Sequence, residues 1–161
     1  MSKLAGKYAL VASVSLILTS CANYDIPSIE DIKAGNNFAN GLKLEYINLA
    51  ESEMAEYDWS SGSGFLAKAE LAARGAAVAP EVLSEHIWLP DHAVPALESA
   101  RFWLLAALKE GAAEKSPYAA ARAQARFDCL VEEQEEDHQP EDIALCRADF
   151  EAAMALVEEA L

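Results

Sequence analysis

The chain has 161 residues, of which 27 are aspartate or glutamate and 12 are lysine or arginine, so its formal net charge at pH 7 is −15. So acidic a protein is repelled by nucleic acid and by anionic lipid headgroups, which argues against both as partners bound through surface charge. The length is sufficient for one domain with a core of its own.

The first twenty residues have the layout of a secretory signal. They carry Lys3 and Lys7 and no acidic residue, and the apolar run 8–18 follows. This run is too short to span a bilayer, because a membrane-crossing helix needs about 20 apolar residues. We therefore predict that residues 1–20 are a signal peptide that is removed from the mature protein.

The signal ends in Leu18-Thr19-Ser20-Cys21, which resembles the lipobox of bacterial lipoproteins. The resemblance implies cleavage between Ser20 and Cys21, attachment of a diacylglyceryl group to the cysteine sulfur, and acylation of the new amino terminus. Since two or more acyl chains give a stable anchor, Cys21 is expected to hold the protein on a membrane. Ala22 is not the aspartate that signals retention at the inner membrane in many such lipoproteins, so we expect the periplasmic face of the outer membrane.

The rest of the chain predicts an all-α domain. Alanine, leucine and glutamate dominate after residue 36, and no stretch alternates with period two for long enough to indicate strands. The helical domain is expected over residues 37–161. Residues 21–36 are interpreted as the lipidated N-terminus and a short tether, because the helix start at Ser28 is broken by Gly35 within two turns.

The periodicity and the punctuation by glycine and proline predict a small bundle of about five helices. In chain order, we expect a helix over 37–58, a flexible Ser/Gly loop over 59–64, a helix over 65–74, an irregular segment over 76–94, and a helix over 95–110. In the first of these helices, Glu51, Glu53 and Glu56 are expected to point outward, away from the apolar face.

The last two helices are predicted to form a hairpin. One runs from Pro117 to about Glu135 and the other begins after Pro140, and each carries an apolar stripe. A turn centred between Asp137 and His138 would place the two stripes face to face.

This hairpin brings two cysteines to the same level, Cys129 and Cys146. They are the two that remain once Cys21 is modified, and the periplasm is oxidising, so we predict a disulfide between them. A redox role is disfavoured, because reactive thiol pairs usually lie two residues apart beside a helix N-terminus.

Other chemistry has little support in the sequence. His86 and His92 do not share a helix face and are expected at the surface, so we predict no metal site. The acidic turn 132–137 would attract calcium, but it lacks the ligand spacing and the central glycine of a calcium loop, and a solvated hairpin tip explains it as well. No nucleophile or oxyanion-hole motif accompanies the carboxylates, so we predict neither an enzyme nor a cofactor.

The signal and lipobox, together with residues 21–53, 68–81 and 123–150, resemble the N-terminal region of proteobacterial outer-membrane lipoproteins of the OmpA family. In that family the helical region is followed by an OmpA-like domain that binds peptidoglycan. That domain has no counterpart in these 161 residues, so no wall-binding residue is assigned. Peptidoglycan is an expected partner only if such a domain follows in a longer form of the protein.

The expected function is therefore that of a lipid-anchored outer-membrane lipoprotein with a structural, envelope-tethering role. The alternative is a periplasmic helical binding module or assembly factor that recruits a protein partner. A broad exposed apolar groove on the folded domain would favour this alternative, and a uniformly charged surface would disfavour it.

Overall fold

The computed structural model describes residues 25–161, so the predicted signal peptide, Ser20 and the lipidation site Cys21 lie outside the described residues. Every regular element in the described part is helical, which confirms the all-α prediction. The five longest helices are α2 (Asn37–Ala55), α3 (Trp59–Ala73), α4 (Val94–Lys109), α6 (Pro117–Glu136) and α7 (Pro140–Ala160). Shorter pieces are α1 (Ile26–Glu30), the 3-10 turn η1 (Leu83–Glu85) and α5 (Ala112–Lys115).

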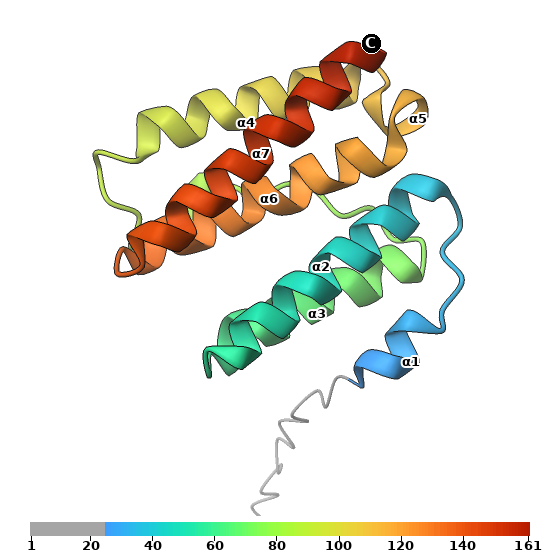
Figure 1. Ribbon diagram of the computed structural model, residues 1–161, viewed down its shortest axis with the longest axis horizontal. Helices are drawn as coiled ribbons and strands as arrows, with labels where there is room; N and C mark the ends of the chain where they lie inside the picture. The colour runs from blue at the N-terminus through green and yellow to red at the C-terminus, as the bar shows by residue number, and fades with distance from the viewer. Residues whose placement is uncertain (1–24) are drawn as a thin grey trace, which may run out of the picture.

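The long helices form two hairpins that pack on each other (Figure 1). Helices α2 and α3 make the first hairpin, α6 and α7 make the second, and α2 lies along α6 to join them. Helix α4 packs on α6 and α7. Helix α1 lies at one edge of the molecule, whereas the C-terminal end of α7 lies at the opposite edge (Figure 1).

The core lies between the two hairpins. Its largest buried side chains come from both, and include Tyr46, Leu66, Phe127 and Met154. Burying one such apolar side chain contributes about 1.5–3 kcal/mol. The helices approach closely where α2 carries Gly41, since a Cβ atom there would lie 2.7 Å from the Cβ of Ala121 on α6.

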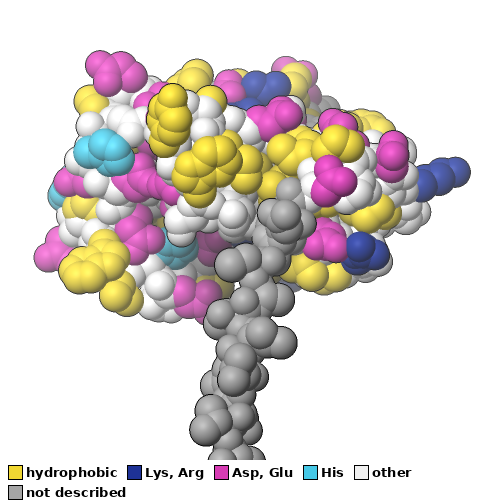
Figure 2. Space-filling view, turned by 90° about the horizontal axis from the view of Figure 1, so that it is seen from below, with side chains coloured by type: hydrophobic (Ala, Val, Ile, Leu, Met, Phe, Trp, Pro, Cys, Tyr) yellow, Lys and Arg dark blue, Asp and Glu magenta, His cyan; other side chains and the backbone are white. Residues whose placement is uncertain are grey.

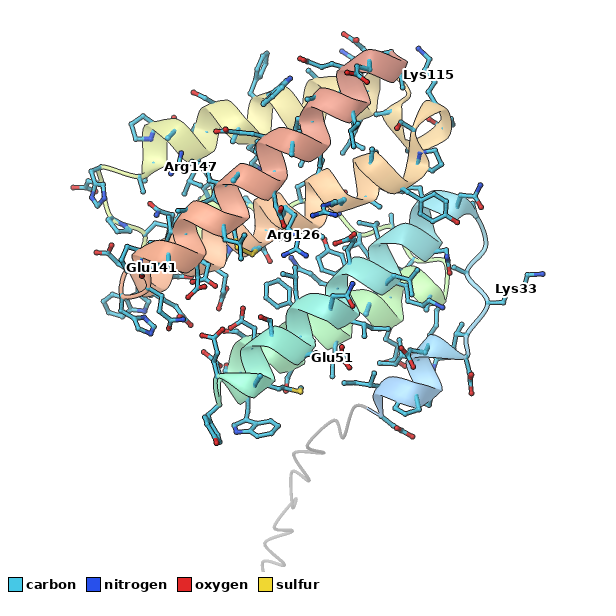
Figure 3. The ribbon with its side chains drawn as sticks, in the orientation of Figure 1. Lys33, Glu51, Lys115, Arg126, Glu141 and Arg147 are labelled. Atoms are coloured by element: carbon cyan, nitrogen blue, oxygen red, sulfur yellow. A yellow bond between two sulfur atoms is a disulfide. The ribbon has the colours of Figure 1, made fainter. Side chains whose placement is uncertain are left out.

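A charged side chain also links three helices across this core. Arg126, labelled in Figure 3, extends from α6 to Glu45 on α2, with 3.5 Å between the closest nitrogen and oxygen atoms. Its Nε atom also lies 3.4 Å from Oδ2 of Asp149 on α7. The guanidinium group therefore lies where the two hairpins meet.

The predicted C-terminal hairpin and its disulfide are confirmed. Cys129 and Cys146 are bonded, with 5.8 Å between their Cα atoms, and both side chains are buried. The turn between α6 and α7 contains Asp137 in the left-handed conformation, with φ of 50°. Closing a loop of this length stabilises the fold by about 3 kcal/mol.

The prediction of a flexible loop over residues 59–64 is wrong, because this Ser/Gly run forms the start of α3. The carboxylate of Asp58 caps the helix, since its Oδ1 atom accepts hydrogen bonds from the backbone N–H groups of Ser60 and Ser61, both at 2.9 Å. A Cβ atom at Gly62 would lie 2.9 Å from Cγ of Met54. The glycine therefore allows α3 to pack tightly on α2, which composition alone does not reveal.

The described part of the predicted tether is also folded onto the domain. Ile29 of α1 is buried in the core. The Nζ atom of Lys43 on α2 donates hydrogen bonds to the backbone carbonyls of Glu30 at 2.7 Å and Ile32 at 3.0 Å. The domain therefore begins before residue 37. Among residues 25–161, no helix combines the length and the apolar character that crossing a bilayer requires.

Candidate functional site

The structure brings together one of the predicted residue pairs, Cys129 and Cys146, and separates the histidines. Both sulfur atoms are in the disulfide, which links α6 to α7 covalently. His92 and His138 are exposed, in separate loops. His86 lies elsewhere, between two carboxylates, so the three imidazoles do not converge on a common site.

A buried carboxylate on α6, which the sequence interpretation missed, joins four segments of the chain. Asp128 is 1% exposed. Its Oδ2 atom accepts hydrogen bonds from the hydroxyl of Tyr46 on α2 and from Nζ of Lys68 on α3, each at 2.7 Å. Its Oδ1 atom accepts a hydrogen bond from the backbone N–H of Glu81 at 2.8 Å. Three donors therefore face one buried carboxylate, and burial still outweighs them, so that the pKa of Asp128 lies above its ordinary value.

The pKa shifts of Lys68 and Tyr46, which both bind Asp128, indicate a structural role for these residues. Burial lowers the pKa of the Lys68 ammonium, but the facing carboxylates of Asp128 and Glu81 together raise it by more, so the net pKa lies above its ordinary value. Burial, followed by the charge of Asp128, raises the pKa of the Tyr46 hydroxyl well above its ordinary value. Lysine and tyrosine thus keep their protons near neutral pH.

The same network continues into the irregular segment 76–93. Glu81 forms an ion pair with Lys68, and its other oxygen lies 3.1 Å from Nε2 of His86. The Nδ1 atom of His86 lies 2.6 Å from a carboxylate oxygen of Glu135 on α6. That carboxylate also accepts a hydrogen bond from the backbone N–H of Trp88 at 3.0 Å. The network therefore holds the irregular segment against α6.

The expectation that His86 is a surface histidine is wrong, since its side chain is 12% exposed. Burial lowers the pKa of its imidazole, but the two facing carboxylates of Glu81 and Glu135 raise it by more, so its pKa lies above the ordinary value. The imidazole is therefore a cationic link at mildly acidic pH.

A second group of carboxylates lies where the turn between α2 and α3 meets the turn between α6 and α7. We call it the acidic end; its members are Glu53, Glu56, Asp58, Glu132, Glu133, Glu136 and Asp142. A pocket of about 350 Å³ opens there, and its lining includes Glu53, Asp58, Glu136 and His138. Carboxylate oxygens of Glu53, Asp58 and Glu136 lie within 4.8 Å of one another.

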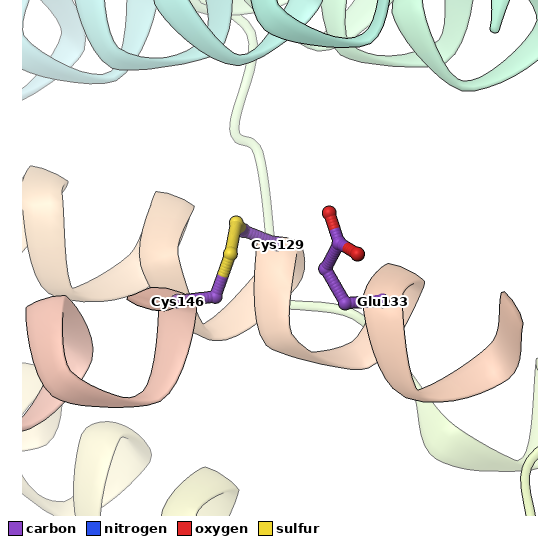
Figure 4. Close-up of side chains that lie close together, drawn as sticks. All are labelled: Cys129, Glu133 and Cys146. Carbon is purple, nitrogen blue, oxygen red and sulfur yellow. A yellow bond between two sulfur atoms is a disulfide. The ribbon is translucent and has the colours of Figure 1, made fainter. Parts of the chain in front are cut away.

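Two carboxylates of the acidic end are buried, which corrects two expectations. Glu53, expected to point outward, and Glu133, expected in a solvated hairpin tip, are each 7% exposed. No hydrogen bond from the described residues reaches the Oε2 atom of Glu133. Figure 4 shows its carboxylate beside the disulfide, pointing from α6 toward the layer formed by α2 and α3.

Burial and like charges make these two groups hard to ionise. Burial raises the pKa of Glu53 to about 8, and the neighbouring carboxylates, led by Glu133, act in the same direction. Burial likewise raises the pKa of Glu133 to about 7, assisted by Asp142 and Glu136. Glu53 and Glu133 therefore keep their protons to a higher pH than ordinary glutamates do.

The sequence contains one signal for Asp128. Ala121, Gln124, Asp128 and Val131 follow one another at helical spacing and are all buried, so they form a second stripe beside the apolar stripe that faces α7. A polar residue on such a stripe is a candidate for a buried network. No comparable signal marks the acidic end, since its members come from three helices and the turns between them.

Comparison of the chain with protein-family models, with curated proteins and with solved structures gave no match. The assignment of function therefore rests on the sequence motif and on the geometry described above.

Proposed function

We propose that the protein is a lipid-anchored lipoprotein of the outer membrane, whose helical domain faces the periplasm and has a structural, envelope-tethering role. The observation that carries this proposal is the pairing of the cysteines. The sequence contains three, and two of them form the disulfide between α6 and α7. The third is Cys21, the last residue of the lipobox-like motif Leu18–Cys21.

The disulfide supports the proposed compartment. Disulfides persist in oxidising surroundings such as the bacterial periplasm and are rare in the cytosol. The predicted signal peptide, residues 1–20, would direct the chain to that same compartment. Signal, lipobox and disulfide therefore agree with one another.

The surface supports attachment through lipid rather than through charge. Figure 2 views the molecule from the side on which α1 lies, and acidic side chains are scattered over this face with few basic ones among them. Such a face gains nothing from anionic headgroups. Two or more acyl chains on Cys21 would supply the binding energy instead.

The positions of the chain ends suit a spacer. Helix α1, on the side of the proposed anchor, and the end of α7 lie at opposite edges of the domain (Figure 1). If the resemblance to OmpA-family lipoproteins holds for the whole protein, the domain is the N-terminal part of a tether between the outer membrane and the cell wall. Peptidoglycan would then be bound by a C-terminal domain of a longer form.

The test is the intact mass of the protein from the outer-membrane fraction, measured with and without reductant. We expect residues 21–161 plus three acyl chains, with two hydrogens gained on reduction. The control variant Cys21→Ala is expected to lose both the lipid and the outer-membrane location while keeping its disulfide. A wild-type mass without lipid would refute the proposal, and a larger mass that includes a further domain would support the wall tether.

One observation favours the alternative function, a helical module that binds a protein partner. Phe102 on α4 is 76% exposed, and with Leu105 it lines a partly apolar groove of about 460 Å³. A photo-reactive cross-linker placed at Phe102 would test this, with Leu71 on α3 as a matched exposed control. A discrete cross-linked product in cells from the first position, and none from the second, would favour the partner-binding role.

A further inference from the structure

We propose that the outer face of α4 binds the same face of a second copy of this chain, so that the two α4 helices pack antiparallel about a two-fold axis. This pairing gives a partner to the groove at Phe102, and it rests on the partner-binding alternative proposed above. It does not depend on the lipid anchor.

The side chains along α4 form a stripe with an apolar centre and charged ends. Its four members are exposed and follow one another at intervals of four, three and four residues, which places them on one side of a helix: Glu98, Phe102, Leu105 and Lys109. Phe102 is 76% exposed and Leu105 is 37% exposed. The apolar pair is therefore flanked by an acidic residue at one end and a basic residue at the other.

This stripe is complementary to itself when one copy is reversed. A two-fold axis halfway between positions 103 and 104 relates Phe102 to Leu105 and Glu98 to Lys109. Phe102 then packs on Leu105 of the second copy, while Glu98 faces Lys109 of the second copy. Because the axis repeats each contact, the interface gains every apolar contact and every opposite-charge pair twice.

The same charges disfavour a parallel pair. Parallel helices would place Glu98 beside Glu98 of the second copy and Lys109 beside Lys109 of the second copy. Like charges brought together across an interface cost free energy, whereas the antiparallel pair brings opposite charges together. The charges at the ends of the stripe therefore select the antiparallel orientation.

Neither charge of the stripe is used inside the domain. In the part of the chain that the structure describes, Glu98 and Lys109 take part in no ion pair. Helix α4 also lies at an outer edge of the molecule, on the side opposite α1 (Figure 1). A second copy can therefore reach the stripe and pair with both charges.

The surface beside the stripe has the relief that helix packing requires. Two grooves adjoin Phe102 and Leu105. The groove of about 460 Å³ extends toward Lys109, and a second groove, of about 260 Å³, extends toward Glu98 and is also lined by Leu83. When helices pack, the side-chain ridge of one fits into the groove of the other. The ridge at Phe102 and Leu105 offers both to a second copy.

The contact is short, so the association should be weak. Positions 98–109 cover about 16 Å of helix. A contact of this size falls among the weak interfaces, which bury less than about 1,200 Å² in total. Two chains of net charge −15 also repel each other, and about 0.15 M salt screens this repulsion beyond about 8 Å. We expect a dissociation constant on the order of 10⁻⁵ M at that salt concentration.

Sedimentation equilibrium of the intact chain in about 0.15 M salt measures this association. Detergent micelles in excess keep lipid anchors from holding two chains together. Phe102→Ala should weaken the dimer about tenfold or more. Leu71→Ala is the matched control, because it removes another exposed apolar side chain, on α3, and it should leave the dimer unchanged. A wild-type chain that is still monomeric at about 10⁻⁴ M would overturn the proposal, as would equal association in Phe102→Ala and wild type.

Charge reversal tests the antiparallel register. Glu98→Lys and Lys109→Glu should each weaken self-association about tenfold or more, because each turns both opposite-charge pairs into like-charge pairs. The double variant Glu98→Lys/Lys109→Glu should regain the wild-type affinity. An equal mixture of the two single variants should also form dimers, since each chain then carries the charges that complement the other.

Glu51→Lys is the control for net charge, because Glu51 is exposed on α2 (Figure 3) and the change in charge is the same as in Glu98→Lys. It should associate like the wild type, and far-UV circular dichroism checks that every variant is folded. If the mixed variants stay monomeric, the antiparallel register is wrong. A cross-linked product at Phe102 that contains a different protein would overturn the pairing of two copies and leave the partner-binding alternative in place. The intact mass decides the lipid on Cys21 separately.

Discussion

Helix α6 carries two buried carboxylates five residues apart, and their surroundings differ. Asp128 receives three hydrogen bonds, from Tyr46, Lys68 and the backbone of Glu81. Glu133 receives none at its Oε2 atom and is surrounded by other carboxylates. Burial raises the pKa of both groups, but three donors, among them the ammonium of Lys68, oppose this rise at Asp128, whereas the neighbours of Glu133 add to it.

The two surroundings differ because Asp128 and Glu133 face different parts of the neighbouring helices. At Asp128, α6 is opposite the middle of α2 and α3, where one lysine and one tyrosine point inward. At Glu133, α6 is opposite the end of α2, which contributes Glu53 and Glu56. A buried carboxylate is stabilised where tertiary packing places hydrogen-bond donors around it. At the acidic end, tertiary packing places other carboxylates around it instead.

The largest expected effect on stability follows from removing the carboxylate of Asp128. Asp128→Ala leaves the ammonium of Lys68 and the hydroxyl of Tyr46 without their shared acceptor. The free energy of unfolding should fall by about 3–5 kcal/mol, because one member of a buried pair is lost. Urea denaturation measures this, with the exposed Glu151→Gln as control. A loss below about 1 kcal/mol would contradict the view of Asp128 as the centre of the network.

The second-largest effect is expected from removing the disulfide, whose Cys129 lies between Asp128 and Glu133 on α6. The double variant Cys129→Ala/Cys146→Ala should lose about 3 kcal/mol, the value for closing a loop of this length. Wild-type protein unfolded in reductant should match the variant in stability. If the oxidised wild type and the variant denature at the same urea concentration, the disulfide does not stabilise the domain.

A smaller effect, of opposite sign, is expected from neutralising the acidic end. Because the pKa values of Glu53 and Glu133 are raised in the folded protein, to about 8 and about 7, both groups bind protons more tightly there than in the unfolded chain. Their contribution to stability is present below their ordinary pKa and is lost as the pH rises through 7 and 8. Wild-type stability should therefore fall between pH 5 and pH 9.

The double variant Glu53→Gln/Glu133→Gln should flatten this pH profile and be about 1–2 kcal/mol more stable than wild type at pH 9, after discounting for solvent screening. Glu51→Gln should keep the wild-type slope. Wild-type stability that stays constant or rises across this range would refute the assigned shifts.

The smallest effect concerns His86, at the outer part of the compensated network. Its raised pKa means that the link to Glu81 and Glu135 stabilises the fold fully below pH 6.5 and weakens as the pH rises through the folded-state pKa. His86→Gln should lose about 0.5–1 kcal/mol at pH 5.5 and less at pH 9. His92→Gln, in an exposed position, is the control. Equal losses at the two pH values would mean that the charge of His86 does not contribute.

The local pattern of the sequence determined the all-α class, the long helices and the C-terminal hairpin. Prolines at positions 117 and 140 and glycine at 111 mark helix boundaries through their own backbone restrictions, which act over a few residues. The disulfide followed because a hairpin fixes which residues face each other. The lipid on Cys21 stays a prediction from the same kind of short motif.

Only the tertiary structure decided the rest. The Ser/Gly run is helical because Asp58 caps it and Gly62 fits against Met54, and its composition alone indicates a loop. Tyr46 and Asp128, joined by one hydrogen bond, are 82 positions apart in the chain. The acidic end is assembled from α2, α6, α7 and the turn between α2 and α3. Burial and pairing of charge depend on which helices pack together, and helical periodicity tells which face of a helix is apolar without saying what lies opposite it.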